Sequence, residues 1–570
     1  MHPALSIAEL VDIVCEKLKE PEGDNRFGFQ GTLASLAVTS RAFQEPALDA
    51  LWSSHCGIHN IIKCLPSHLW ETQPDTHILT FFTRFSVHII GSIEAEDWTI
   101  ALSYARRIKH LFMGPPLGTR FPDVAVFETV FSSLPSSQRL CPNLRFLDWG
   151  VEAETHLEYM NLFLSPRVKG ICITISHFDI PIPSNLALQS VDTLRVLCPN
   201  AGNSEAYILC RSACDLIKQL DRIERLWVPN LDGETLQHLS GLPSLMVLNL
   251  DYGKVPFLSS GEAPLRPGFS ALRKAHFSRA LPDFIVNFLK LQSSGHAITE
   301  FLISIVPTHF EEAQSLWTLF AAMNTHIPCT SLKKIVVSMA EDRWLEWSYS
   351  MSVADGNIND LIPLFSFRNL VTVHLTLPFV AQIEDAMAMD MAVSWPKLRE
   401  LVLMEPSVPR HRILRQRPPP RTTLNALLAF ATHCRDLERL ALQVDGSIAI
   451  LAPTDGHFPE PQFTLRKFKV GSSPIGSSNV DSVAEFLGLL FPGLKSIQFA
   501  GDGFGLGTRE VARTTQASWK MVQKKLREGK HVWARIGWKM IPAARATEAR
   551  WKRSCCGPRG SVCEHRLASC

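Results

Sequence analysis

A six-residue pattern, apolar-x-x-apolar-x-apolar, recurs along most of the chain. Fourteen copies occur between residues 108 and 499, and thirteen of them are complete. Successive side chains of a strand point to opposite faces, so the alternation at the end of each copy predicts a strand. The copies begin at Ile108, Leu144, Val168, Leu194, Ile223, Leu245, Leu272, Ile298, Leu332, Leu370, Leu398, Leu437, Leu465 and Leu494.

Amphipathic stretches between these strands predict helices. They cover Glu205–Leu220, Glu311–Met323, Ile383–Val393, Leu424–Thr432 and Ser482–Leu490. A further apolar residue, often followed by Pro, recurs three positions before ten of the fourteen strand patterns, and proline there ends the helix. A helix-turn-strand unit of about 30 residues cannot bury its apolar face alone, so we expect neighbours to stack into a solenoid. The predicted fold is α/β, with parallel strands on the concave face and helices on the convex face.

The amino-terminal segment has a different pattern. Leu10, Ile13, Val14 and Leu18 share one face of a predicted helix, and residues 32–38 and 44–51 predict two more short helices. Three short helices make a small core of marginal stability. We therefore expect three parts: a helical module at 1–70, the solenoid at 71–507 and a carboxy-terminal tail at 508–570.

Both patterns resemble known families. Residues 100–500 resemble leucine-rich repeat proteins. The amino-terminal segment resembles an F-box, and with Glu96-Asp97-Trp98 the chain is similar to the F-box/leucine-rich repeat proteins of mushroom-forming fungi. The residues that carry the F-box resemblance are Leu5, Ile7, Leu10, Val14, Leu33, Leu36, Phe43, Pro46, Leu51 and Trp52.

The F-box resemblance implies a function. Such a chain is the substrate-recognition subunit of an SCF-type cullin-RING E3 ubiquitin ligase, docked on a Skp-family adaptor and cullin. The alternative is a protein-interaction scaffold without ligase association. The resemblance implies that the adaptor contacts Leu5, Ile7, Leu10, Val14, Leu36, Pro46, Leu51 and Trp52, although the same side chains could simply form the helical core.

The repeats are the predicted site for an unidentified protein substrate. Alternation leaves the residues between core positions on the open strand face, and aromatic residues and Arg are frequent in binding hot spots. The substrate-binding candidates are Arg225, Trp227, His374, Glu400 and Arg439. A Pro-rich basic segment at 410–421 interrupts the repeats and predicts an exposed loop. The loop 405–421 that contains it is the next candidate for substrate binding.

Composition and charge limit the other classes. The chain has 570 residues, is 46% hydrophobic and 20% charged, and carries a net charge of +2. It lacks an apolar run long enough to span a bilayer and an amino-terminal secretion signal, so we expect a cytoplasmic or nuclear protein without membrane contact. No nucleophile-base arrangement stands out, so we expect neither catalysis nor a cofactor.

The metal-binding residue types have simpler interpretations. Cys141, Cys329 and Cys434 occupy the apolar position before a strand, where burial explains them without a metal. His55 and His59 are spaced for one helix face, but Gly57 lies between them and we expect a surface pair. The cysteines from Cys555 to Cys570 lack the paired spacing of a zinc site. We therefore expect no metal.

The tail differs in charge from the rest. Residues 508–570 hold 15 Lys or Arg against 4 Asp or Glu, a net charge of +11, and residues 1–507 carry −9. We predict a solvated helix or a disordered extension. Its interleaved Trp and Lys make it the one segment where nucleic acid or anionic lipid could bind.

Overall fold

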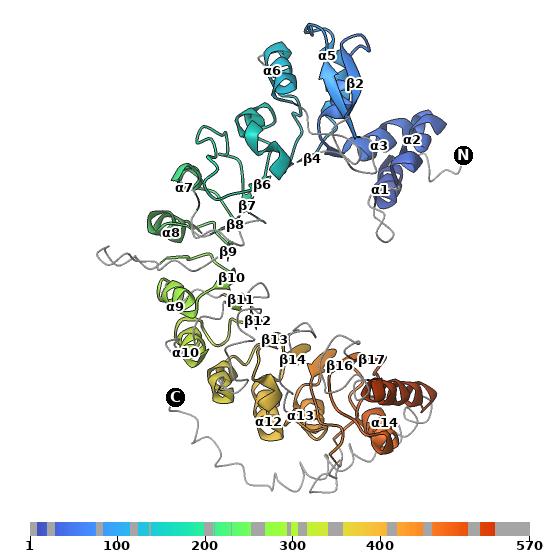
Figure 1. Cartoon of the computed structure of the whole chain (residues 1–570), viewed down its shortest axis with the longest axis vertical. Helices are drawn as coiled ribbons and strands as arrows, with labels where there is room; N and C mark the ends of the chain where they lie inside the picture. Colours follow the sequence, from blue (N-terminus) through green and yellow to red (C-terminus); the bar gives the residue numbers. More distant parts are fainter. Residues whose placement is uncertain are drawn as a thin grey trace, which may run out of the picture. The chain divides into compact units, whose positions relative to one another are not determined.

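The structure is a computed structural model in which parallel strands alternate with helices (Figure 1). Two compact units divide the chain: Met1–Leu272 with Leu291–Ser293, and Arg273–Lys290 with Ser294–Cys570. The α/β prediction is confirmed for both. The residues that the structure describes are 8–19, 29–75, 84–114, 123–135, 138–198, 209, 211–229, 231–251, 268–292, 298–305, 316–339, 357–406, 419–448, 459–499 and 513–529.

Within the described residues the first unit contains seven parallel strands and the second contains eight. Those of the first unit are hydrogen-bonded in the order β1-β4-β5-β6-β7-β8-β9. They are β1 (Ser54–Cys56), β4 (His110–Met113), β5 (Phe146–Trp149), β6 (Gly170–Thr174), β7 (Thr193–Leu197), β8 (Arg225–Val228) and β9 (Val247–Asp251). An antiparallel pair, β2 (Trp70–Asp75) with β3 (Arg84–Ile89), forms a separate sheet.

The helices of the first unit begin with three consecutive ones and continue between the strands (Figure 1). They are α1 (Ala8–Leu18), α2 (Phe29–Thr39), α3 (Arg41–Trp52), α4 (His59–Ile62), α5 (Trp98–Ala105), α6 (Val124–Ser133), the 3-10 segment η2 (Val151–Leu162), α7 (Arg211–Lys218) and α8 (Gly233–Ser240).

The second unit contains eight strands in sequential order, all parallel to their neighbours. They are β10 (Lys274–Ala280), β11 (Glu300–Ile305), β12 (Lys334–Met339), β13 (Thr372–Thr376), β14 (Glu400–Met404), β15 (Arg439–Leu442), β16 (Lys467–Gly471) and β17 (Ser496–Phe499).

Helices of the second unit lie along one side of these strands (Figure 1). They are α9 (Pro282–Lys290), α10 (Leu316–His326), η5 (Ile358–Ser366), η6 (Val380–Gln382), α12 (Asp385–Ser394), α13 (Ala426–His433), η8 (Ser477–Asn479), α14 (Val480–Leu490) and the helix of residues 513–529.

A strand lies at each of the fourteen predicted positions, from β4 to β17. The core residues are in register: Leu111, Leu147 and Ile171 are direct neighbours on three adjacent strands, and each is at most 1% exposed. The sequential parallel order within each unit is compatible with a solenoid, because each strand buries its apolar side chains against the next repeat.

The apolar residue before each strand has a defined role in the turn. In six of the ten turns it is buried, and its carbonyl accepts a hydrogen bond from the backbone N–H three residues later. A single tight turn therefore leads into the strand. The pairs are Cys141 with Leu144, Phe269 with Leu272, Phe367 with Leu370, Trp395 with Leu398, Cys434 with Leu437, and Phe491 with Leu494.

Cys329 is an exception, and its predicted burial is wrong because the thiol is exposed. In this repeat the turn closes one residue earlier, from the N–H of Ser331 to the carbonyl of Pro328 at 2.9 Å. Ile327, which is 2% exposed, fills the core instead.

The structure also shifts the predicted part boundaries. β1 follows α3 directly and pairs with β4, so the first sheet begins before residue 70.

The segment after residue 507 contains the helix of 513–529, in which Trp519 is fully buried and donates from Nε1 to the carbonyl of Ser473 at 2.9 Å. This helix covers the last repeats, because β17 would otherwise leave its apolar side without a following repeat. The residues beyond 529 lie outside the described part.

Candidate protein-interaction surfaces

Three helices at the amino terminus pack around a small core. Its buried members are Val11, Cys15, Leu33, Ala37, Ala47 and Ala50. Leu36, Phe43, Leu48 and Leu51 are partly buried against them. Three of these six buried residues are alanines, Ala37 on α2 and Ala47 and Ala50 on α3. Their small side chains allow the two helices to pack closely.

A second apolar face of α1 points to solvent. Leu10, Ile13 and Val14 are 40%, 55% and 42% exposed, and Val38 on α2 is 86% exposed. The spacing i, i+3, i+4 places the three α1 residues on one side, whereas Val11 and Cys15 point to the core. We call Leu10, Ile13 and Val14 the α1 apolar surface. Sequence reasoning selected this face of α1 but missed Val11 and Cys15 as the core side of the helix.

The predicted adaptor-binding residues divide into distinct groups. Leu10 and Val14 belong to the α1 apolar surface, and Leu36, Pro46 and Leu51 are half-buried, with Leu36 and Leu51 packed on the core. Leu5 and Ile7 lie outside the described residues.

Trp52 has an intramolecular role. Its indole stacks on His55 with ring centroids 4.9 Å apart and on Tyr104 of α5 at 4.8 Å. These contacts arise because β1 follows α3 immediately and pairs with β4. The structure therefore places Trp52 at the junction between the helices and the first sheet.

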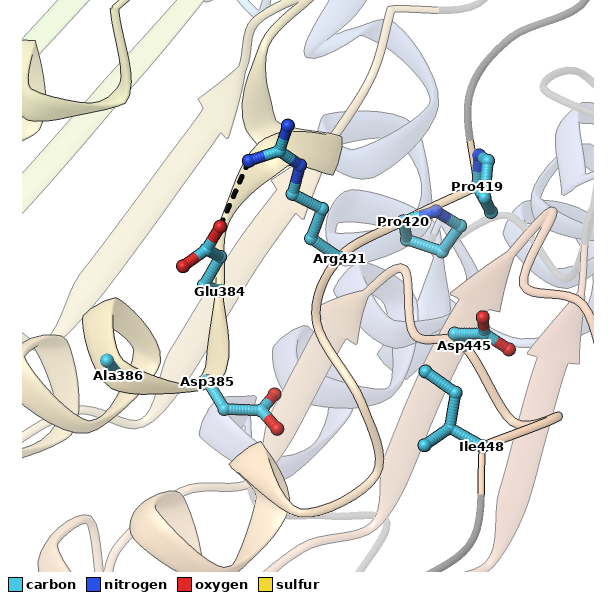
Figure 2. A pocket seen from close by; sticks show the side chains of 8 residues that line it. All are labelled: Glu384, Asp385, Ala386, Pro419, Pro420, Arg421, Asp445 and Ile448. Atoms are coloured by element: carbon cyan, nitrogen blue, oxygen red, sulfur yellow. Dashed lines mark hydrogen bonds and ion pairs between the residues drawn. The ribbon is translucent and has the colours of Figure 1, made fainter.

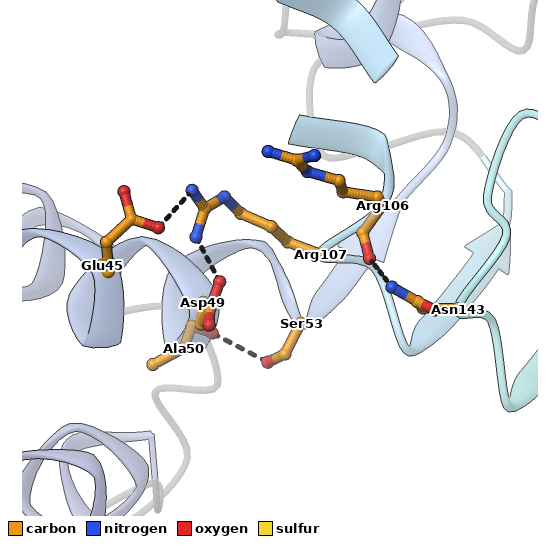
Figure 3. A network of polar contacts seen from close by, with 7 residues as sticks. All are labelled: Glu45, Asp49, Ala50, Ser53, Arg106, Arg107 and Asn143. Carbon is orange, nitrogen blue, oxygen red and sulfur yellow. Dashed lines mark hydrogen bonds and ion pairs between the residues drawn. The ribbon is translucent and has the colours of Figure 1, made fainter. Parts of the chain in front are cut away.

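Arg107 fastens the helical module to the repeats (Figure 3). Its Nη2 lies 2.7 Å from Oε2 of Glu45, and its Nη1 contacts Asp49 one helical turn further along α3. The Arg107 side chain is only 13% exposed. Lys109 and His110 reinforce the junction, since both backbone N–H groups donate to the carbonyl of Ser53. The orientation of the α1 apolar surface relative to the first strands is thus set by several contacts.

The histidine pair is not on the surface, so that expectation is wrong. His59 is 2% exposed, and His55 is half-buried between Trp52 and Asn60, whose Nδ2 lies 3.0 Å from its Nε2. Burial, with a smaller effect of His59, lowers the pKa of His55 to about 4. A neutral His55 imidazole stacked on Trp52 in this junction has a structural role.

On the first unit, Arg225 and Trp227 lie on the strand face opposite the core. Arg225 donates from Nε to Oγ1 of Thr193 at 2.9 Å, and its Nη2 lies 3.3 Å from Asp192. The guanidinium of Arg195 lies 4.3 Å from the centre of the Trp227 ring. Trp227 is half-buried, because the neighbouring strand covers one ring face with this cation.

On the second unit, Glu400 holds the other candidates together. Its Oε2 lies 2.7 Å from Nη2 of Arg439, and its Oε1 lies 3.2 Å from Nε2 of His374, at ion-pair distance without hydrogen-bond alignment. Burial lowers the pKa of His374, and the Glu400 carboxylate opposes that shift. Three adjacent strands, β13 to β15, thus join their open-face side chains in one network.

A pocket that sequence reasoning missed lies at the carboxyl ends of these strands (Figure 2). Its volume is about 550 Å³, and its wall includes Glu384, Asp385, Asp445 and Ile448. Pro419, Pro420 and Arg421 also line it, with Arg421 paired to Glu384 at 3.0 Å. Asp385 accepts two hydrogen bonds from Thr423. Asp445 is far in sequence from the adjacent residues Glu384 and Asp385, and no local pattern joins them. The remainder of the predicted 410–421 loop, residues 410–418, lies outside the described range.

The described residues contain no group of three or more His, Cys, Asp or Glu side chains placed to bind a metal ion. The cysteines from Cys555 onward lie outside them. Among the residues that the structure describes, no helix has both the length and the apolar composition needed to cross a bilayer.

No family model and no curated sequence matches the chain.

Proposed function

We propose that this chain is an F-box/leucine-rich repeat protein that recognises substrates for an SCF-type E3 ubiquitin ligase. The helical module would dock a Skp-family adaptor and thereby cullin, and the open strand face would bind a protein substrate. The observation that carries the proposal is the α1 apolar surface, beside a three-helix core that already has its own apolar side chains.

Exposure of this surface has a cost that a partner would remove. Apolar side chains at i, i+3 and i+4 are the anchors by which one helix fits an apolar groove of another protein. Burial of Leu10, Ile13 and Val14 by a partner would contribute about 25 cal/mol to the binding free energy for each Å² of apolar area removed from water. Surfaces of this kind on a small module are typical of protein interaction sites.

The junction supports a role in positioning. In the proposed complex the chain does no bond chemistry, and it would bring a substrate close to the charged ubiquitin-conjugating enzyme. Proximity of this kind lowers a barrier only when the geometry is maintained. Arg107, Ser53 and β1 join the module to the first strands, so an adaptor on α1 would have a defined orientation to them.

One observation favours the alternative of an interaction scaffold without ligase association. Trp52, which the F-box resemblance assigns to the adaptor, has both His55 and Tyr104 stacked on it. An adaptor would then contact a smaller set of side chains, mainly those of α1 and α2.

The test is direct binding of a purified Skp-family adaptor to the full chain and to a Leu10→Asp/Val14→Asp variant. Both side chains are exposed, so we expect the variant to fold and to lose adaptor binding by at least about a hundredfold, since a charge in an apolar contact is left unpaired.

The matched control is Ile100→Asp/Phe131→Asp, because both residues are 61% exposed in the first unit but lie on α5 and α6. It should keep full adaptor binding. If the native chain does not bind the adaptor, or the Leu10/Val14 variant binds it equally well, the ligase proposal is wrong and the scaffold remains.

A further inference from the structure

The open face of the last strands carries a row of cations. Glu400, Arg439 and Lys467 are direct neighbours on β14, β15 and β16. Lys469 lies two residues beyond Lys467 on the same face of β16, and its neighbour on β17 is Gln498. Adjacent strands are about 4.8 Å apart, and alternate residues of a strand are about 7 Å apart. Arg439, Lys467 and Lys469 therefore form a compact group, which we call the β15–β16 basic surface.

Other cations in these rows have acidic partners. Lys274 pairs with Glu300 at 2.6 Å across β10 and β11, and within the β15–β16 basic surface Arg439 pairs with Glu400 at 2.7 Å. The Glu400 side chain is only 16% exposed, so its carboxylate interacts with side chains of the neighbouring strands. Among the residues that the structure describes, no carboxylate pairs with Lys467 or Lys469, and both lysines are exposed.

Placing like charges opposite each other on neighbouring strands is unfavourable. Arg439 and Lys467 are such a pair, and Lys469 adds a third positive charge. An anion bound between them would relieve this repulsion. Arg439 is already held in place by Glu400, so less side-chain freedom would be lost on binding.

We infer that the β15–β16 basic surface binds an acidic segment of a partner protein, with carboxylate or phosphate groups against Lys467 and Lys469. This inference rests on the proposed function, because it names the chemical class of substrate that the open face selects. Gln498 would supply a neutral amide donor beside Lys469. The contacts are charge-assisted hydrogen bonds, which are stronger than neutral ones.

The size of the surface favours a peptide over nucleic acid. Nucleic-acid binding proteins neutralise about six to ten phosphates, whereas this group has three cations. Three cations match a short acidic segment better than a long polyanion.

The experiment measures fluorescence anisotropy of labelled peptides with the full chain at about 150 mM salt, where surface charges act over only about 8 Å. The probes are peptides of equal length: one alternates Glu and Ser, one carries phosphoserine, and one alternates Gln and Ser. A single-stranded DNA of the same length is the fourth probe. We expect one or both acidic peptides to bind about tenfold tighter than the Gln/Ser peptide. Which of the two binds tighter distinguishes carboxylate from phosphate as the bound group.

The test variant is Lys467→Glu/Lys469→Glu. Its matched control is Lys290→Glu/Lys397→Glu, which changes the same charge on exposed residues outside the open-face rows of the same unit. We expect the test variant to lose the preference for acidic peptides and the control to keep it, with equal thermal unfolding midpoints.

Equal binding of the acidic peptides by both variants would overturn the inference, and so would tighter binding of the DNA probe than of either acidic peptide. Adaptor binding is measured in parallel on the same samples. If the adaptor binds and the peptides do not, only this inference fails; if the peptides bind and the adaptor does not, only the ligase proposal fails.

Discussion

The guanidinium of Arg107 lies 2.7 Å from the carboxylate of Glu45, joining the turn before β4 to the third helix of the amino-terminal module. The two residues are 62 positions apart, and the contact is made because α5 returns the chain to the side of α3. Arg107, whose side chain is mostly buried, is thus one of the residues that connect two parts that the sequence pattern separates.

Replacing Arg107 with Ala is expected to destabilise the first unit by about 1 kcal/mol, since Glu45 and Asp49 stay exposed and can be hydrated after the change. Hydrogen exchange should speed up in α3 and β1. Arg106→Ala is the matched control, because Asn143 contacts the Arg106 backbone carbonyl and not its side chain. Identical exchange in both variants would contradict the fastening role.

Trp519→Ala should destabilise the second unit by about 3–5 kcal/mol, because the indole is fully buried and a large cavity would remain. Met521→Ala on the same helix should change stability little, since that side chain is 49% exposed. The measurement is the free energy of unfolding by urea. Equal values for the two variants would mean that the helix of 513–529 does not cap the last repeats.

Trp227→Ala is expected to cost about 1 kcal/mol, chiefly the contact with Arg195, because the ring lies half-buried on the open face. Trp149→Ala should cost about 3–5 kcal/mol, because that ring is fully buried in the core of the same unit. Denaturant unfolding of both variants checks the expectation. A cost for Trp227 as large as that for Trp149 would place it in the core and remove it from the substrate surface.

Stability should fall as the pH decreases from about 6.5 to about 4. In this range the unfolded chain protonates His55, whereas burial in the folded chain holds the pKa of this residue at about 4. The unfolded state therefore binds more protons, and stability rises with pH across this window. His55 accounts for at most about 3 kcal/mol of the change in the free energy of unfolding over this pH range.

His55→Phe would keep an aromatic ring against Trp52 and remove the titration. Thermal unfolding midpoints between pH 4 and pH 7 should then depend less on pH than in the native chain. His68→Phe, at an exposed position, should leave the pH dependence unchanged. An equal slope in the native chain and the His55 variant would show that another group is responsible.

The sequence alone determined the α/β class, all fourteen repeated strands and the presence of three amino-terminal helices. The reason is that each of these features repeats a local period. Leu111 lies between the exposed residues His110 and Phe112, and α1 has apolar residues at helical spacing, so the pattern follows from side-chain direction within one element.

Only the tertiary structure decided which apolar face of α1 is buried, because Val11 and Leu10 are equally apolar and the choice depends on what α2 and α3 offer. It also brought Trp52 into contact with Tyr104, Arg107 into contact with Glu45, and Trp519 into contact with Ser473. Each of these contacts joins segments that are distant in sequence. The cationic neighbours Arg439 and Lys467 likewise meet only through strand register. Local periodicity specifies the elements, whereas the pairing of their faces depends on contacts that no single segment contains.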